Sequence, residues 1–312
     1  MISEKKMILL VILSSVIISG CLEPEGVAKV NLSNRTIDNI ENSDTQSLRI
    51  AVSAIISPDE TLVYYQDMFD YLSLKIGVPV KLVQRKTYQE VNDLIRKNSV
   101  DAAFVCSLAY IEGTDQFGLE LLAVPIVRGE PRYYSYIIVP EDSSINSLKE
   151  LKGKTFAYTD PLSNSGKLSP EYMITQMGEN PETFFKFTFF TYSHDKSIQA
   201  VAEKMVEGAA VDSLVWDFKN ATDPRFTSRT RIISKSPPFG VPPVVVSKDI
   251  DPALKEKLRK ILLQMHEDKK GKEILDRIMI DRFSEANDSL YNSVREMKKV
   301  VSDAKTKDTS YK

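Results

Sequence analysis

A short turn of small polar residues is the part of this sequence best suited to hold an anion. Residues 160–170 read Asp-Pro-Leu-Ser-Asn-Ser-Gly-Lys-Leu-Ser-Pro, between a strand-like run at 155–158 and a helix predicted over 167–176. The first N–H groups of a helix lack intrahelical acceptors and lie at the positive end of its dipole. Small polar side chains there favour a seat for a tetrahedral oxyanion. The residues concerned are Ser163, Asn164, Ser165 and Gly166.

The alternative is that Ser163 or Ser165 only caps the helix, since serine is a preferred residue at a helix start. The turn alone does not separate capping from ligand binding. Other polar groups predicted at the carboxyl ends of neighbouring strands are therefore needed to distinguish the two.

Two further strand ends carry ionisable side chains. His194 follows the strand-like run 187–192 and opens the next helix, where imidazole can donate to an anion that favours its charged form. Asp212 follows an apolar strand segment, and it suits an anion site only if the ligand still has a proton to give. The alternatives are a capping-region histidine and a strand-end salt bridge. The other histidine, His266, lies in a charged helix end and is expected to be solvated.

Two tyrosines are further candidates for ligand contacts. Tyr88 opens a helix after the second strand, and Tyr133 flanks a predicted crossover. A phenol can hydrogen-bond an oxyanion or stack on an organic substituent. Half-buried packing is the alternative for each of them.

Enzyme motifs are missing from the sequence. There is no His-Glu-x-x-His, no Gly-x-Ser-x-Gly and no cysteine–histidine cluster for zinc. Gly166-Lys167 is a poor match to a phosphate-binding loop, because Leu168 stands where a serine or threonine is needed. Cys106 is predicted to be a buried small apolar residue, although it is the one thiol that an enzyme could use beside His194. No catalytic activity, metal or cofactor is predicted.

Composition indicates a globular body without a charged partner surface. The 312 residues are 42% hydrophobic and 27% charged, which is enough for two lobes. The net charge of −2 excludes the basic field that nucleic-acid binding requires.

The N-terminus predicts export. Residues 1–20 combine Lys5-Lys6, an apolar run and Ile18-Ser19-Gly20 before Cys21, and this resembles the lipobox of secreted lipoproteins. Cys21 would then carry the lipid, and residues 21–47 would form a flexible polar spacer. The alternative is an uncleaved signal anchor. Both place the body outside the cytoplasmic membrane and attached to its outer face.

The remaining chain alternates strands with helices, which predicts parallel sheets. The first lobe would contain strands at 48–53, 78–83 and 100–105, with helices between them. We expect lobe 1 over 48–135, lobe 2 over 136–236, a return to lobe 1 over 237–304, and a frayed polar tail over 305–312. Ligands of such folds bind at the carboxyl ends of strands, between the lobes.

These motifs together resemble the phosphate/phosphite/phosphonate solute-binding proteins of ABC importers, the PhnD-like group. The pattern Asp-Pro-x-Ser-x-Ser-Gly at 160–166 is similar to that family's anion-binding turn, Tyr88 to its first-lobe tyrosine, and Ser193-His194 to its ligand-facing histidine. Three further segments also match that family: the small-residue loop at 106–110, the crossover at 131–134 and the segment 206–217. The resemblance covers most of the chain beyond the spacer.

The resemblance implies a type II periplasmic-binding-protein fold, with two α/β lobes and a ligand cleft between them. It implies that Ser163, Asn164 and Ser165 hold the phosphonyl oxygens. The supporting groups would be the amides near Gly166 and the side chains of His194, Tyr88 and Tyr133, with Ser107 of the small-residue loop in the same site.

One departure from the family bears on the ligand. Members that recognise an aminoalkylphosphonate carry an acid near the return crossover, where this chain has Val241, and a second near 214–216, which is also apolar here. An uncharged phosphonate, phosphite or phosphate needs neither acid. Asp212 could accept a proton from such a ligand, which would disfavour sulfate.

We therefore expect a lipid-anchored, monomeric solute-binding protein that delivers a phosphorus oxyanion to an ABC permease in the membrane. A binder of another oxyanion, such as a sulfonate or nitrate, is the nearest alternative. A module that reports its ligand to a membrane sensor is the alternative from another class.

Overall fold

The computed structural model describes residues 47–285 and 287–309. The predicted signal segment, the lipidation site Cys21 and nearly all of the 21–47 spacer lie outside this range. Within it, no helix has both the length and the apolar character needed to cross a membrane.

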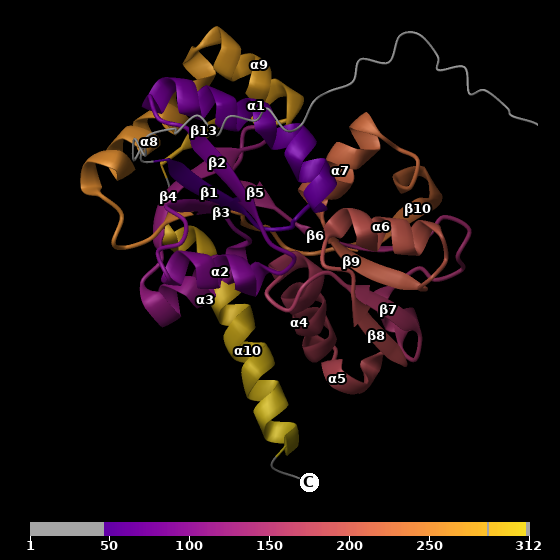
Figure 1. The fold of residues 1–312 in the computed structure, drawn as a ribbon. Helices are drawn as coiled ribbons and strands as arrows, with labels where there is room; N and C mark the ends of the chain where they lie inside the picture. Colours follow the sequence, from indigo (N-terminus) through magenta and orange to yellow (C-terminus); the bar gives the residue numbers. More distant parts are fainter. Residues whose placement is uncertain (1–46, 286, 310–312) are drawn as a thin grey trace, which may run out of the picture. The chain divides into compact units, whose positions relative to one another are not determined.

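The first sheet has six strands in the order β13-β4-β12-β3-β1-β2 (Figure 1). β1 pairs in parallel with both β2 and β3, whereas β12 runs antiparallel to β3 and β4. The strands are β1 (Leu48–Val52), β2 (Val80–Gln84), β3 (Ala102–Phe104), β4 (Glu120–Ile126), β12 (Val244–Val246) and β13 (Arg282–Ser284).

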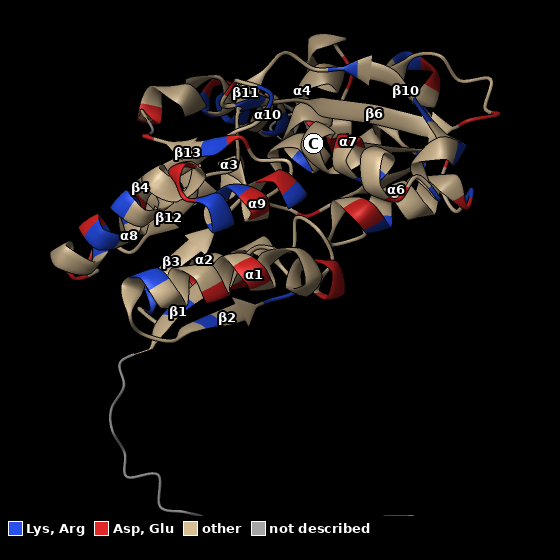
Figure 2. Cartoon of the chain, turned by 90° about the horizontal axis from the view of Figure 1, so that it is seen from above, with Lys and Arg blue, Asp and Glu red and all other residues tan. Residues whose placement is uncertain are grey.

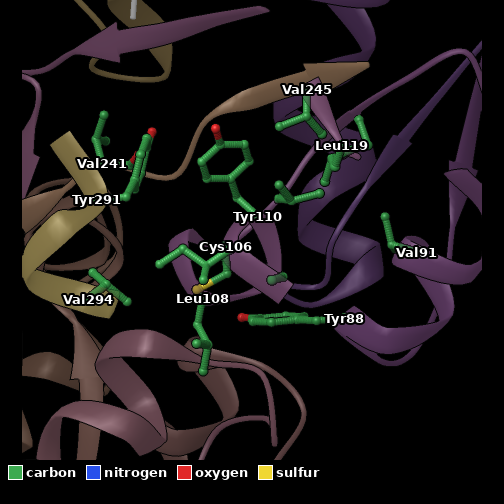
Figure 3. Close-up of a cluster of buried hydrophobic side chains, with 14 of the residues drawn as sticks. Tyr88, Val91, Cys106, Leu108, Tyr110, Leu119, Val241, Val245, Tyr291 and Val294 are labelled. Carbon is green, nitrogen blue, oxygen red and sulfur yellow. The ribbon is translucent and has the colours of Figure 1, made fainter. Parts of the chain in front are cut away.

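Helices cover both faces of this sheet. They are α1 (Pro58–Ile76), α2 (Tyr88–Arg96), α3 (Ser107–Phe117), α8 (Pro252–Gln264), α9 (Lys269–Arg277) and α10 (Asn292–Thr309). One core, with Tyr88, Val91, Tyr110 and Tyr291, lies beneath α2, α3 and α10 (Figure 3), and a second, with Phe69 and Leu262, lies beneath α1, α8 and α9. Burial on both faces explains the apolar β3 and β12.

The second sheet has five strands in the order β10-β6-β9-β7-β8. Its strands are β6 (Ser135–Pro140), β7 (Thr155–Tyr158), β8 (Phe187–Phe190), β9 (Gly208–Asp212) and β10 (Thr230–Lys235). Its helices are α4 (Ser169–Gln176), α5 (Pro181–Phe184), α6 (His194–Ala202) and α7 (Ser213–Thr222). Two apolar cores again lie on its opposite faces. These two sheet-containing lobes are the α/β architecture predicted from the sequence.

The two sheets are linked by a pair of chain crossovers. β5 (Arg132–Tyr133) leads from the first sheet to the second, β11 (Phe239–Gly240) leads back, and the two pair in an antiparallel ribbon. Ser135 and Ser236 extend this pairing, because the Ser236 N–H donates to the Ser135 carbonyl and the Ser135 N–H donates to Ser236 Oγ. The crossovers are therefore held to each other side by side.

Acidic and basic residues share the outer helices, as α8 and α9 show in Figure 2. Their mixture fits the small net charge of the sequence. Many of them form surface ion pairs such as Arg259–Glu256 and Lys298–Asp115, which contribute little individually to stability.

Three predicted elements are wrong in part. The apolar run over 209–215 predicts a strand, but β9 ends at Asp212 and α7 begins at Ser213, because the Asp212 side chain caps that helix. The expected small-residue loop at 106–110 is the start of α3, with Ser107 as its first residue. Residues 305–309 of the expected tail are helical, because α10 continues to Thr309, and Lys305 pairs with Glu171.

Candidate functional site

The serine turn is a single wide helical turn, Asn164–Leu168, that leads into α4. The Leu168 N–H donates to the Ser163 carbonyl five residues back, and the Gly166 N–H donates to Ser163 Oγ at 2.9 Å. Ser163 therefore caps the turn, as the capping alternative expects. A Cβ at Gly166 would lie 2.4 Å from Thr159 Oγ1, so only glycine fits there. Wide turns of this kind are common at functional sites.

Ser165 is different from Ser163. Its side chain is fully buried, and its Oγ has no hydrogen-bond partner among the described residues. Its carbonyl accepts from Ser135 Oγ at 2.6 Å, which fixes the backbone of the turn against β6. A buried hydroxyl on a fixed backbone without a partner needs an explanation, and a bound anion would supply one.

His194 is the first residue of α6 and is buried. Its Nδ1 accepts the Asp212 N–H at 3.0 Å, and Thr159 Oγ1 lies 3.1 Å from the same nitrogen. Because Nδ1 is an acceptor, the proton of the neutral ring is on Nε2, which lies 3.5 Å from Ser163 Oγ. Burial lowers the pKa of His194 to about 3, so the ring is a neutral donor at physiological pH.

Asp212 ends β9 and caps α7, with its Oδ1 accepting the Leu214 N–H at 2.8 Å. It forms no ion pair within the described part of the chain, so the predicted alternative of a strand-end salt bridge is not found there. Burial raises its pKa to about 7. The carboxyl group therefore changes charge near neutral pH and can either donate or accept a proton.

Tyr133, Asn164 and Ser107 join three segments of the chain. Asn164 Nδ2 donates to Tyr133 Oη at 2.9 Å, and Ser107 Oγ lies 3.3 Å from the same oxygen and donates to the Gly240 carbonyl at 2.7 Å. The second lobe thereby contacts the β5–β11 ribbon and the start of α3.

Cys106 lies beside this group as a buried free thiol. Its sulfur accepts the Asn164 N–H at 3.3 Å, and burial raises its pKa to about 11. A thiol with that pKa is protonated and a poor nucleophile at neutral pH. The structure therefore gives no support to the thiol chemistry considered in the sequence.

Tyr88 begins α2 and is fully buried. Its N–H donates to Asp160 Oδ2 at 3.2 Å, and its ring lies beside Cys106 with the hydroxyl end turned toward Cys106 and Leu108 (Figure 3). Burial, followed by the nearby Cys106 and Asp160, raises its pKa well above the ordinary value. The phenol is therefore a neutral donor, and its oxygen has no hydrogen-bond partner in the described chain.

Sequence reasoning missed Ser53 and Thr159. Ser53 follows β1, is fully buried, and has an Oγ without a partner among the described residues, like Tyr88 and Ser165. Thr159 follows β7 and contacts His194 Nδ1. Both are small polar residues directly after a strand, the signal that identified the other candidates, but each stands alone in its sequence neighbourhood.

The structure brings the predicted residues into one connected region. Hydrogen bonds or close contacts link Ser163 to His194, His194 to Asp212, and Asn164 to Tyr133 and thence to Ser107. The described residues contain no group of three acidic, histidine or cysteine side chains able to hold a metal. The region can offer several neutral donors to one anion.

Comparisons with known proteins relate this chain to a family of transport proteins. Residues 50–291 match the model of a family described as the periplasmic substrate-binding protein of phosphonate ABC transporters. The phosphonates-binding periplasmic protein of Escherichia coli is 28% identical over 75% of this chain and 69% of its own length. A probable phosphite-binding ABC transporter protein of Prochlorococcus marinus, PhnD1, is 29% identical over 50% of this chain and 54% of its own.

Solved structures show the same fold. A binding protein component of a Pseudomonas aeruginosa ABC phosphonate transporter superposes with a TM-score of 0.79 at 24% identity, covering 83% of this chain and 87% of its own. PhnD1 of Prochlorococcus marinus in complex with methylphosphonate superposes with a TM-score of 0.75 at 22% identity, covering 82% of this chain and 98% of its own. At these identities the likeness concerns the fold alone.

Proposed function

The chain belongs to the family of periplasmic substrate-binding proteins of phosphonate ABC transporters, and on this premise we propose that it binds a small phosphorus oxyanion between its two lobes. The candidates are a phosphonate, phosphite or phosphate. The protein presents the anion to a membrane permease and does no covalent chemistry. A lipid on Cys21 would hold it at the outer face of the cytoplasmic membrane.

One observation carries this proposal. Several hydroxyl groups are buried without hydrogen-bond partners in the described chain, and those of the candidate site come from both lobes: Ser53 and Tyr88 from the first, Ser165 from the second. A buried polar group without a partner costs about 1–3 kcal/mol. An anion that accepts from these groups on closure would remove this cost, and His194 Nε2 would add another donor.

The number of acceptor oxygens favours a tetrahedral anion. Donors from Ser53, Tyr88, Ser165 and His194 belong to four different segments of the chain. A tetrahedral oxyanion offers several oxygens in different directions, and hydrogen bonds to such a charged acceptor are about twice as strong as neutral ones. Asp212, with a pKa near neutrality, would favour an anion that still carries a proton.

The test is calorimetric titration of the full chain, held in lipid nanodiscs, with phosphate, phosphite, methylphosphonate, 2-aminoethylphosphonate and sulfate. We expect tight binding of at least one phosphorus anion and a loss of tenfold or more in Ser165→Ala and His194→Asn. The matched control is Ser144→Ala at an exposed loop serine, which should bind like the wild type. Binding of sulfate alone, or of none of these anions, would reject the proposal.

A further inference from the structure

An apolar cleft lies between residues of the two lobes. It encloses about 130 Å³, many times the roughly 10–15 Å³ that one water requires. We use the name apolar cleft for the space lined by, among others, Tyr65, Phe104, Val127, Leu214, Phe218 and Ile280. Carbon atoms form most of its exposed lining, so water in it would find few partners.

The cleft also meets the candidate anion site. Ser53 and Asp212 belong to its lining, and both are residues of the candidate anion site, which we also call the polar region. Tyr65 is close to Asp212, whose charge joins burial in raising the pKa of Tyr65 to about 12. A ligand whose anionic end contacts Ser53 would therefore have its other end directed into the cleft.

The cleft contains few groups that could pair with a positively charged ligand atom. Its charged lining residues in the described chain are Arg128, Asp212 and Asp217, and Arg128 and Asp217 already pair with each other at 2.7 Å. Asp212 has one oxygen engaged in capping α7. Val241 is fully buried in the same lining and supplies only methyl groups. An ammonium group placed here would lose its hydration without a full set of acceptors.

We infer that the natural ligand is an organophosphonate with an uncharged, apolar substituent of more than one carbon, and that this substituent occupies the apolar cleft. This inference rests on the proposed function, because it assigns the phosphorus group to the serine turn. Apolar groups moved from water into such a lining gain affinity in proportion to the area buried. The cleft thus selects the organic half of the ligand and the polar region its anionic half.

The test compares homologous ligands on the full chain in lipid nanodiscs, by calorimetry without free detergent. Methyl-, ethyl-, propyl- and butylphosphonate should bind with affinity rising about fourfold per methylene group. Propylphosphonate and 2-aminoethylphosphonate have nearly the same shape and differ in a terminal methyl or ammonium group. Propylphosphonate should bind at least tenfold more tightly.

A substitution in the cleft provides the second arm. Leu214→Glu places a carboxylate in the lining, and it should raise the affinity for 2-aminoethylphosphonate relative to propylphosphonate by about tenfold or more. Leu214→Gln, of similar size but uncharged, should weaken propylphosphonate without favouring the ammonium. Retained methylphosphonate binding and an unchanged melting temperature show that each variant is folded.

The outcomes separate the two proposals. Affinity that rises with chain length supports the cleft assignment. Methylphosphonate or phosphate binding with no gain from longer chains, or a preference for 2-aminoethylphosphonate in the wild type, would overturn this inference and leave the proposed function intact. Failure of every phosphorus anion to bind would overturn both.

Discussion

Ser163 and Ser165 lie two residues apart in the same turn, and their hydroxyl groups have different surroundings. Ser163 Oγ accepts the Gly166 N–H, whereas Ser165 Oγ has no partner in the described chain. The first hydroxyl therefore stabilises the turn, and the second is the one that we propose contacts the ligand.

Substituting each serine separately should show that one mainly affects folding stability and the other mainly affects ligand affinity. Ser163→Ala should lower the free energy of unfolding by about 1 kcal/mol through loss of the cap. Ser165→Ala should leave it unchanged or slightly higher, because it removes an unpaired buried hydroxyl, and should weaken the phosphorus ligand about tenfold. Urea denaturation and calorimetry check the two expectations. A Ser165→Ala variant that binds normally would show that this hydroxyl does not contact the ligand.

His194 and Asp212 should influence stability in the same pH range with opposite signs. The pKa of His194 falls from 6.5 to about 3 on folding, so the unfolded chain binds the extra proton and stability falls on acidification from about 6.5 to 3. The pKa of Asp212 rises from 3.8 to about 7, so the folded chain binds the extra proton and stability rises on acidification from about 7 to 4.

Single substitutions should reveal these opposed contributions. Relative to wild type, His194→Asn should gain stability as the pH falls from 6.5 to 4, and Asp212→Asn should lose it, each by about 1.4 kcal/mol per pH unit at most. Asparagine keeps an acceptor near Nδ1 in the first case and the cap of α7 in the second. Denaturation midpoints measured across this pH range provide the test, and parallel curves for all three proteins would contradict it.

Asp212 should also control discrimination against sulfate. Above pH 7 its carboxylate is charged and repels an anion with no proton to donate, whereas below its pKa of about 7 it is neutral and can donate itself. Sulfate binding to the wild type should therefore strengthen as the pH falls from 8 to 5. Asp212→Asn should bind sulfate about tenfold more tightly at pH 8 and show little pH dependence. Equal pH profiles would remove Asp212 from this role.

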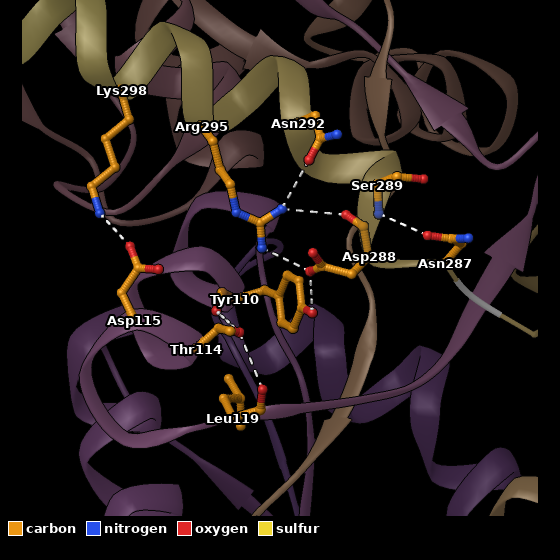
Figure 4. A network of polar contacts seen from close by, with 10 residues as sticks. All are labelled: Tyr110, Thr114, Asp115, Leu119, Asn287, Asp288, Ser289, Asn292, Arg295 and Lys298. Atoms are coloured by element: carbon orange, nitrogen blue, oxygen red, sulfur yellow. Dashed lines mark hydrogen bonds and ion pairs between the residues drawn. The ribbon is translucent and has the colours of Figure 1, made fainter.

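At the scale of elements, α10 is held by contacts with both lobes. Arg295 of α10 pairs with Asp288, which accepts from Tyr110 Oη at 2.7 Å on α3 (Figure 4). Further along, Lys305 reaches Glu171 of α4 at 3.1 Å, and Lys167 of the serine turn reaches the same oxygen at 3.0 Å. Glu171 thus connects α10, α4 and the serine turn.

Removing the charge of Glu171 should destabilise the protein. Glu171 is 6% exposed, so its pairing with two lysines is partly shielded from water. We expect Glu171→Gln to lower the free energy of unfolding by about 1–3 kcal/mol. Glu182→Gln is the matched control, since Glu182 is exposed and lies 3.9 Å from Lys305, and it should change stability by less than about 0.5 kcal/mol. Equal effects of the two variants in urea denaturation would contradict this reading of Glu171.

The elements also show which features the sequence reveals. β7 was predicted at Thr155–Tyr158 from a short strand-like run that the Asp-Pro turn follows, and it lies there. The starts of α3 and α7 were not predicted. Only two residues separate Ser107 from the end of β3, and Ser213 follows β9 directly, so no turn pattern marks either helix start. The helical extension of α10 depends on a contact with Glu171, 134 residues away in the chain, which no local pattern contains.

The side chains of the candidate site could be predicted from the sequence, but their hydrogen-bond partners could not. Strand ends followed by small polar residues located Ser165 and His194, but the same pattern at Ser53 passed without notice. The tautomer of His194 and the cap formed by Asp212 depend on backbone groups brought together by folding. The roles of these residues in binding stay predictions, as do the lobe boundaries at 135 and 236.

At the scale of the whole molecule, both hydrogen bonds and ion pairs connect the lobes. The Tyr88 N–H donates to Asp160, the His194 N–H donates to the Ile55 carbonyl at 3.0 Å, and the Ser57 N–H donates to Asp195 at 2.9 Å. Opening the lobes about the paired β5 and β11 crossovers would break all of these contacts. Each of them therefore favours the closed arrangement.

The pair formed by Lys219 of α7 and Glu60 of α1 gives the clearest test of this closure. Lys219 is 7% exposed, and its Nζ lies 3.2 Å from Glu60 on the other lobe. Lys219→Met keeps the apolar stem and removes the charge, so it should shift the population toward open forms. We expect a larger radius of gyration by small-angle scattering without ligand, an affinity about fivefold lower, and the wild-type radius once ligand is saturating.

The control for closure is an ion pair within one lobe. Lys204 pairs with Asp142, both on the second lobe and both exposed, so Lys204→Met should change neither the radius nor the affinity. A Lys219→Met protein with weaker binding but an unchanged radius would mean that Lys219 acts within α7, on its neighbour Asp223 at 3.5 Å, and does not help to close the lobes. If both radius and affinity stay at wild-type values, the remaining contacts between the lobes, including the Arg128–Asp217 pair, are sufficient for closure.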